Sequence, residues 1–168
     1  MSIYQNQKAT KPKPEDVAGD SLSAEKSAAV LNLVEFMRAI KVGIQWASGN
    51  SWALNYKSKR LGYLKIFSEK PDTSMFGSWA FCHNRDYLDR YYNMNECDLK
   101  TFIFEHIYAK TCGNCFTSGN MNAQKAGYMN PTDCGCYPLR IFNPDGKTLE
   151  YTKQLIEYRK NCIFENTK

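Results

Sequence analysis

Apolar residues between positions 24 and 44 recur at steps of three and four, which places them on one side of a helix. These residues are Val30, Leu33, Val34, Met37, Ile40 and Ile44. We expect the hydroxyl of Ser23 to cap the first turn of this helix, and we expect Gly43 to mark its end. The pattern therefore predicts an amphipathic helix over residues 24–42.

After residue 50 the spacing changes to strict alternation, which is typical of strands with one covered face. Trp52, Leu54 and Tyr56 occupy every second position. A polar turn follows, and the alternation then predicts a hairpin partner and a third strand. The expected sheet is an antiparallel meander over residues 51–83, to which residues 137–142 add a fourth strand.

The same periodicity rules predict three later helices, over residues 84–92, 96–110 and 147–161. Residues 1–20 are polar and carry two prolines, so we expect them to form a flexible N-terminal arm. Such a segment buries too little apolar surface to offset the conformational entropy that it would lose on ordering. The fold class that these elements predict is α+β. Residues 21–168 would form a single domain, with an antiparallel sheet of about four strands packed against helices.

A cysteine-rich loop over residues 111–136 is the most specific chemical feature of the sequence. Cys112 and Cys115 form a Cys-x-x-Cys pair, and Cys134 and Cys136 form a Cys-x-Cys pair eighteen residues later. Two short thiolate pairs joined by a longer loop suit tetrahedral zinc. Because four thiolates fill the coordination sphere, a zinc ion held there would be structural and not catalytic.

Two alternatives to zinc remain open for this loop. Cys112 and Cys115 have the spacing of a redox-active pair, although they follow a predicted helix instead of opening one. The four cysteines are also compatible with compact, unreactive thiols. A redox protein that uses Cys112 and Cys115 is therefore an alternative function.

The compartment is expected to be the cytoplasm. No charged and apolar N-terminal block with a cleavage site is visible, and no stretch approaches the roughly 20 apolar residues of a membrane span. The cysteine count is seven, an odd number, which does not favour a secreted disulfide framework. We therefore expect no membrane partner.

Aromatic residues gather in the predicted meander, and they suggest a ligand face. We expect Trp52, Tyr56, Tyr63 and Trp79 to hold a small molecule or a protein partner, if these side chains share one concave side. Core packing is the alternative, because aromatic residues also fit the half-buried surface of any sheet.

Four basic residues at the predicted hairpin suggest a different ligand. Lys57, Lys59, Arg60 and Lys65 stand beside tyrosines, as in proteins that bind single-stranded nucleic acid. Residues 24–80 carry eight positive and four negative groups, which is most of the formal net charge of +5. The alternative is that these charges only keep an exposed hairpin from pairing with other edges.

Catalytic motifs are not found. The sequence has two histidines, His83 and His106. It contains no Ser, His and Asp in the order of a catalytic triad, no HExxH motif and no glycine-rich loop of the kind that binds phosphate. The leading hypothesis is therefore a non-enzymatic module that binds a small molecule or partner and contains a structural zinc site. Nucleic-acid binding and thiol redox chemistry are its alternatives, and no catalytic residue is assigned.

Two segments carry a family resemblance. Trp52-Ala-Leu-Asn-Tyr-Lys and Leu61-Gly-Tyr-Leu-Lys-Ile resemble small uncharacterised bacterial α+β proteins of the YdhG type. Phe142-Asn-Pro-Asp and Leu155-Ile-Glu-Tyr-Arg-Lys resemble stretches of small proteins from low-GC Gram-positive bacteria. The resemblance covers about half of the chain and implies an α+β fold and a bacterial cytosolic origin. It implies no active site.

Overall fold

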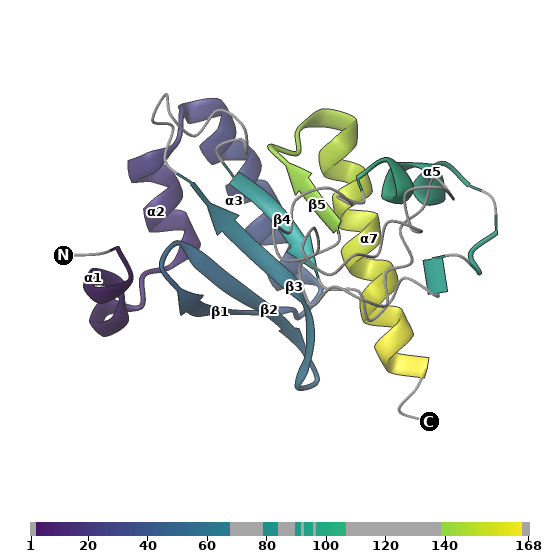
Figure 1. Cartoon of the computed structure of the whole chain (residues 1–168), viewed down its shortest axis with the longest axis horizontal. Coiled ribbons are helices and arrows are strands. Elements are labelled where there is room, and N and C mark those ends of the chain that lie inside the picture. Colours follow the sequence, from purple (N-terminus) through teal and green to yellow (C-terminus); the bar gives the residue numbers. More distant parts are fainter. Residues whose placement is uncertain are drawn as a thin grey trace, which may run out of the picture. The chain divides into compact units, whose positions relative to one another are not determined.

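The computed structural model of the chain describes residues 3–67, 79–83, 90–91, 93–95, 97–106 and 139–165 (Figure 1). The helices are α1 (Ile3–Thr10), α2 (Pro14–Ser21), α3 (Ala24–Ala39), α5 (Asp98–Glu105) and α7 (Gly146–Glu165). The strands are β1 (Gly43–Ser48), β2 (Ser51–Tyr56), β3 (Lys59–Ile66), β4 (Trp79–His83) and β5 (Leu139–Phe142). The predicted α+β fold class is confirmed. The chain divides into two compact units, Met1–Phe81 with Ile141–Lys168, and Cys82–Arg140.

The sheet has five strands in the order β1-β2-β3-β4-β5, one more than expected. β1 pairs antiparallel with β2, with Ile44 opposite Leu54, and β2 pairs antiparallel with β3, with Trp52 opposite Leu64. The additional strand is β1, which the helical spacing of Ile44 concealed. The helix ends at Ala39, Lys41 takes a positive φ of 63°, and the chain turns into β1.

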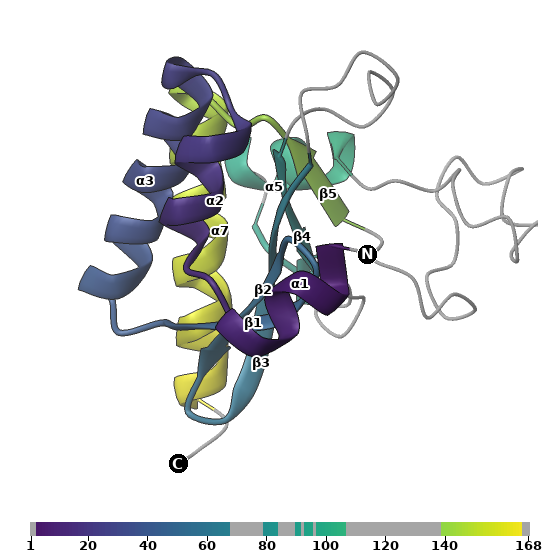
Figure 2. The same ribbon diagram turned by 90° about the vertical axis from the view of Figure 1, so that its left-hand side faces the viewer.

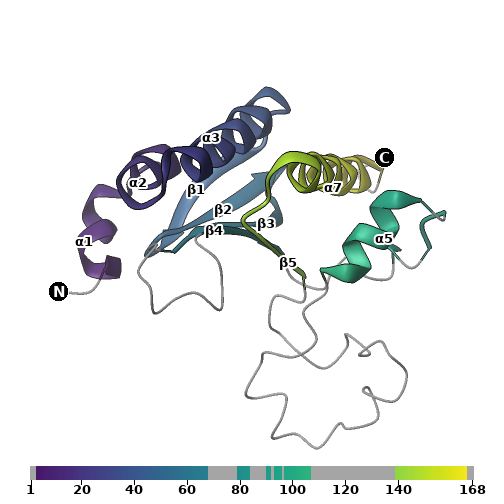
Figure 3. The same ribbon diagram turned by 90° about the horizontal axis from the view of Figure 1, so that it is seen from above.

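Three helices, α2, α3 and α7, lie on one face of the sheet (Figures 2 and 3). Helix α3 buries the side that its periodicity predicts, with Val30, Leu33, Val34 and Met37 in the core. From the sheet, the buried side chains that alternate on β2 and β3 include Trp52, Leu54, Leu64 and Ile66. Alternation therefore predicted correctly that Trp52 and Leu54 are buried, but Ser51 and Ala53 on the other face of β2 are buried as well, so the expectation of a single covered face was wrong for this part of the strand.

Ser23 stands at the N-cap of α3, as predicted, but its hydroxyl forms no capping hydrogen bond. Its backbone carbonyl instead accepts a hydrogen bond from the Ser27 N–H at 2.8 Å. The position of the helix start was correct, and the expected side-chain bond was wrong.

The N-terminal segment requires a correction, because it forms α1 and α2 where we expected a flexible arm. Pro14 opens α2, with Glu15 and Asp16 in the first turn, where carboxylates favour the positive end of the helix dipole. Val17 and Ala18 of this helix are buried, and Glu15 forms an ion pair with Arg38 of α3. The polar composition of this segment concealed two apolar residues that become buried in the folded protein.

Several element boundaries also differ from expectation. Helix α5 begins after Cys97 instead of Asn95, and its described part ends at Glu105. The described parts of the third strand of the expected meander and of the strand expected over residues 137–142 form β4 and β5. The last helix, α7, is longer than the expected 147–161. The cysteine-rich loop over residues 111–136 lies outside the described residues, as does most of the helix expected over 84–92.

Candidate functional site

The turn between β2 and β3 has an unusual backbone. Tyr56 and Lys59 are the last paired residues, and the two residues between them, Lys57 and Ser58, have φ values of 45° and 63°. Two-residue hairpins with two positive φ angles strongly prefer asparagine and glycine, because other residues are disfavoured in the left-handed region. Lysine and serine therefore hold this turn at a cost of about 1 kcal/mol each. Strained positions of this kind often lie at functional sites.

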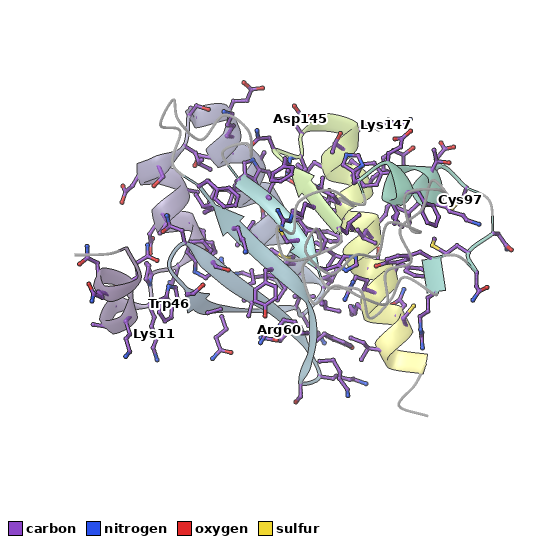
Figure 4. The ribbon with its side chains drawn as sticks, in the orientation of Figure 1. Lys11, Trp46, Arg60, Cys97, Asp145 and Lys147 are labelled. Atoms are coloured by element: carbon purple, nitrogen blue, oxygen red, sulfur yellow. The ribbon has the colours of Figure 1, made fainter. Side chains whose placement is uncertain are left out.

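On one face of the hairpin, three side chains form a connected cluster. Asn55 and Arg60 are opposite each other in the register, and Arg60 Nε donates a hydrogen bond to Asn55 Oδ1 at 2.7 Å. The guanidinium carbon of Arg60 lies 4.8 Å from the centre of the Tyr63 ring. Figure 4 shows the exposed Arg60 beside the two strands. The amide and the ring together hold the guanidinium in one position before any ligand arrives.

Lys65 extends this cluster along β3. It is two residues after Tyr63 and therefore on the same face of the strand. Tyr63 is paired with Ala53, on the side opposite to Trp52 and Leu64. We call the four residues Asn55, Arg60, Tyr63 and Lys65 the hairpin stripe. The helices α2, α3 and α7 lie on the other face of the sheet (Figure 3).

A second cluster is built around Tyr56, on the side of the sheet that the helices cover. Lys57 Nζ lies 5.9 Å from the centre of the Tyr56 ring, and Lys160 Nζ of α7 lies 5.2 Å from it. Lys160 was not among the residues predicted for a site. Its periodicity marked it only as a residue on the exposed face of the last helix, and the approach of α7 to β2 depends on the fold.

The four basic residues of the predicted nucleic-acid site are gathered at one hairpin. Lys57, Lys59 and Arg60 are exposed, and Lys65 is half-buried. They divide between the turn and the hairpin stripe. The structure thus places them where the sequence analysis expected them, and it adds Lys160 as a fifth cation near the turn.

The four residues of the predicted aromatic ligand face are not brought together on one face. Trp52 and Trp79 are each only 1% exposed. Trp52 Nε1 donates a hydrogen bond to the Pro12 carbonyl at 2.8 Å, so its polar edge anchors the N-terminal segment. Strand alternation places Tyr63 on the face opposite Trp52 and Tyr56. The two tryptophans therefore belong to the core, which was the alternative interpretation.

The four cysteines of the predicted zinc site, Cys112, Cys115, Cys134 and Cys136, lie outside the described residues. Within the residues that the structure describes, no three or more histidine, cysteine, aspartate or glutamate side chains are grouped so that they could hold a metal ion. The zinc site therefore stays a prediction from spacing.

The two histidines have structural partners in the unit Cys82–Arg140. His83 and Tyr91 are fully buried, and the Tyr91 hydroxyl lies 3.1 Å from His83 Nε2. His106 Nδ1 donates to the Phe102 carbonyl at 2.8 Å, one turn earlier in α5. Both histidines are thus held by contacts to neighbouring residues.

Comparison with known protein families, curated proteins and solved structures gave no match to this chain. Among the described residues, no helix has the length and apolar character needed to cross a membrane.

Proposed function

We propose that this protein binds single-stranded nucleic acid at the β2–β3 hairpin. The observation that carries the proposal is the cluster of Asn55, Arg60 and Tyr63, in which the Arg60 guanidinium is hydrogen-bonded at 2.7 Å and lies over the tyrosine ring. A guanidinium held in this way serves both as a phosphate partner and as a flat surface for a base.

The chemistry of the other hairpin residues supports the same ligand. Exposed Lys57 and Lys59 supply charges that neutralise phosphates, and Lys65 continues the charge along β3. Unpaired bases stack on aromatic rings, and this contact needs no particular sequence. Duplex bases are already stacked on each other, so the half-buried Tyr63 ring and the exposed Arg60 guanidinium favour a single strand.

The strained turn supports a functional role for the hairpin, because strained backbone often lies at functional sites. A lysine at any exposed position is enough to keep the edge strand of a sheet from pairing with another edge. Here Lys57 itself adopts a φ of 45°, in a turn that asparagine and glycine would form at lower cost. The small-molecule face is not proposed further, because two of its four aromatic residues are in the core.

Structural zinc remains part of the proposal. Four thiolates from Cys112, Cys115, Cys134 and Cys136 would hold residues 111–136 together without a large apolar core. Zinc would stabilise this loop and take no part in binding at the hairpin. Redox chemistry at Cys112 and Cys115 is the alternative use of the loop.

Fluorescence anisotropy tests the proposed function. A labelled single strand of about 12 nucleotides is titrated with the full chain at several salt concentrations. We expect binding at low salt that weakens as salt rises, with a log–log slope of about −0.7 for each phosphate neutralised. The double variant Lys59→Ala, Arg60→Ala should lose most of the affinity and flatten the slope.

The matched control is Lys8→Ala, which removes an exposed lysine from α1. It should bind like the wild type. Absence of binding at low salt, or equal affinity of the hairpin variant and the control, would contradict the proposed function.

A further inference from the structure

Two ammonium groups from distant parts of the chain meet at the Tyr56 ring. Lys57 comes from the turn and Lys160 from α7, and both Nζ atoms lie within 6 Å of the ring centre, at 5.9 Å and 5.2 Å. Lys160 forms no ion pair with a described carboxylate, whereas Lys153, two turns earlier, is paired with Glu150 at 2.7 Å. Two positively charged side chains therefore lie near the Tyr56 ring.

The position of α7 limits what can reach this cluster. The helix lies on the same face of the sheet as α2 and α3 (Figure 2). The Nζ atom of its Lys160 lies 5.2 Å from the centre of the Tyr56 ring. A single-stranded nucleic acid bound along the hairpin stripe lies on the face of the sheet opposite to α7, and it reaches the turn between β2 and β3. Tyr56 and Lys160 lie on the other face of the hairpin, so a bound nucleic acid would have to bend around the turn to pass them, and its end reaches them more easily than its middle.

The end of a nucleic-acid strand differs in charge from the rest. A phosphate monoester carries about −1.5 to −2 at pH 7, whereas each internal diester carries one negative charge. Lysine ammonium groups are compact charges that suit such an anion. We propose that Lys57 and Lys160 form a subsite for the terminal phosphate of a bound single strand, an inference that rests on the proposed function.

Competition binding with chemically defined ends tests this subsite. Three unlabelled strands of one sequence, carrying a 5′-phosphate, a 3′-phosphate or hydroxyl groups only, compete with an internally labelled strand for the full chain. We expect one of the two phosphorylated strands to bind about tenfold more tightly than the hydroxyl strand, a difference typical of charge-assisted hydrogen bonds. The preferred end tells which way the strand lies on the hairpin.

The variant Lys160→Gln should abolish this preference and keep the affinity for the hydroxyl strand within about twofold of the wild type. Lys160→Arg should keep the preference for the phosphorylated strand. The matched control is Lys153→Gln, because Lys153 lies on the same helix and its Nζ also faces a ring, at 5.8 Å from the centre of Phe36. The control should keep the preference. Equal thermal unfolding midpoints of the three variants would show that all are folded.

The outcomes separate the two proposals. If no strand binds at low salt, the proposed function fails. If all three strands bind equally, or if Lys153→Gln loses the preference together with Lys160→Gln, the terminal-phosphate subsite is wrong and the proposed function stands.

Discussion

Gln7 and Asn50 join the N-terminal helix to the turn between β1 and β2 by two hydrogen bonds. Gln7 Oε1 accepts the Asn50 backbone N–H at 2.8 Å, and Gln7 Nε2 donates to Asn50 Oδ1. The same Oε1 also accepts the Trp46 indole N–H at 3.3 Å, and Trp46 lies beside α1 in Figure 4. One amide side chain thus holds a segment whose composition predicts no order.

The variant Gln7→Ala should lower the free energy of unfolding by about 1–2 kcal/mol, because three hydrogen bonds are lost at a half-buried site. Urea unfolding followed by tryptophan fluorescence measures this change. Gln7→Glu is the informative control, since a carboxylate keeps the two accepted bonds and loses the donated one. Unchanged stability in both variants would mean that α1 is not held by this contact.

Relaxing the strained turn should separate stability from binding. Ser58→Gly removes a side chain at a φ of 63° and keeps every charge, so we expect about 1 kcal/mol of added stability with unchanged affinity for a single strand. Adding Lys57→Asn should preserve the gain in stability and weaken binding. Chemical denaturation and anisotropy on the same samples provide the comparison. A double variant that binds like the wild type would remove Lys57 from the site.

Removing the ring of Tyr63 should weaken single-strand binding by about tenfold, because stacking on an aromatic ring contributes about 1–3 kcal/mol per base. Tyr63→Phe keeps the ring and should bind like the wild type, so it serves as the control for Tyr63→Ala. The affinity of duplex DNA should change less than that of the single strand. Equal losses for both nucleic acids would argue against stacking.

Trp52 should affect stability and leave binding unchanged. The Trp52→Phe variant loses the hydrogen bond to the Pro12 carbonyl and leaves unfilled space in the core, at an expected cost of about 1–3 kcal/mol. Thermal unfolding measures the loss, and anisotropy at low temperature measures binding by the folded variant. A clear loss of affinity without a loss of stability would restore Trp52 as a ligand residue.

Zinc in the cysteine-rich loop is tested by native mass spectrometry of protein purified without a nickel column. We expect one zinc ion per chain and four thiols that become titratable after chelation. Cys134→Ser should lose the ion. Metal-free protein with a Cys112–Cys115 disulfide would instead favour the redox alternative.

Local periodicity in the sequence was sufficient to predict part of the core of this fold. The alternation of Trp52, Leu54 and Tyr56 indicated a strand with one covered face, and the three- and four-residue steps of α3 indicated its buried side. The buried side of α3 and the burial of Trp52 and Leu54 were predicted because side-chain direction within one element follows from backbone geometry alone. The basic hairpin was visible for the same reason, since its cations are neighbours in the sequence. The burial of Ser51 and Ala53 on the other face of β2 was not predicted.

The remaining features of the fold and of the candidate site depend on contacts between segments that are distant in the sequence. Ile44 fits the spacing of the preceding helix as well as a strand, and only its pairing opposite Leu54 selects β1. Val17 and Ala18 become buried only once the chain has folded, and Lys160 reaches Tyr56 only when α7 lies on the sheet. Such contacts have no local pattern, because their free energy depends on surfaces that do not exist until the chain has folded.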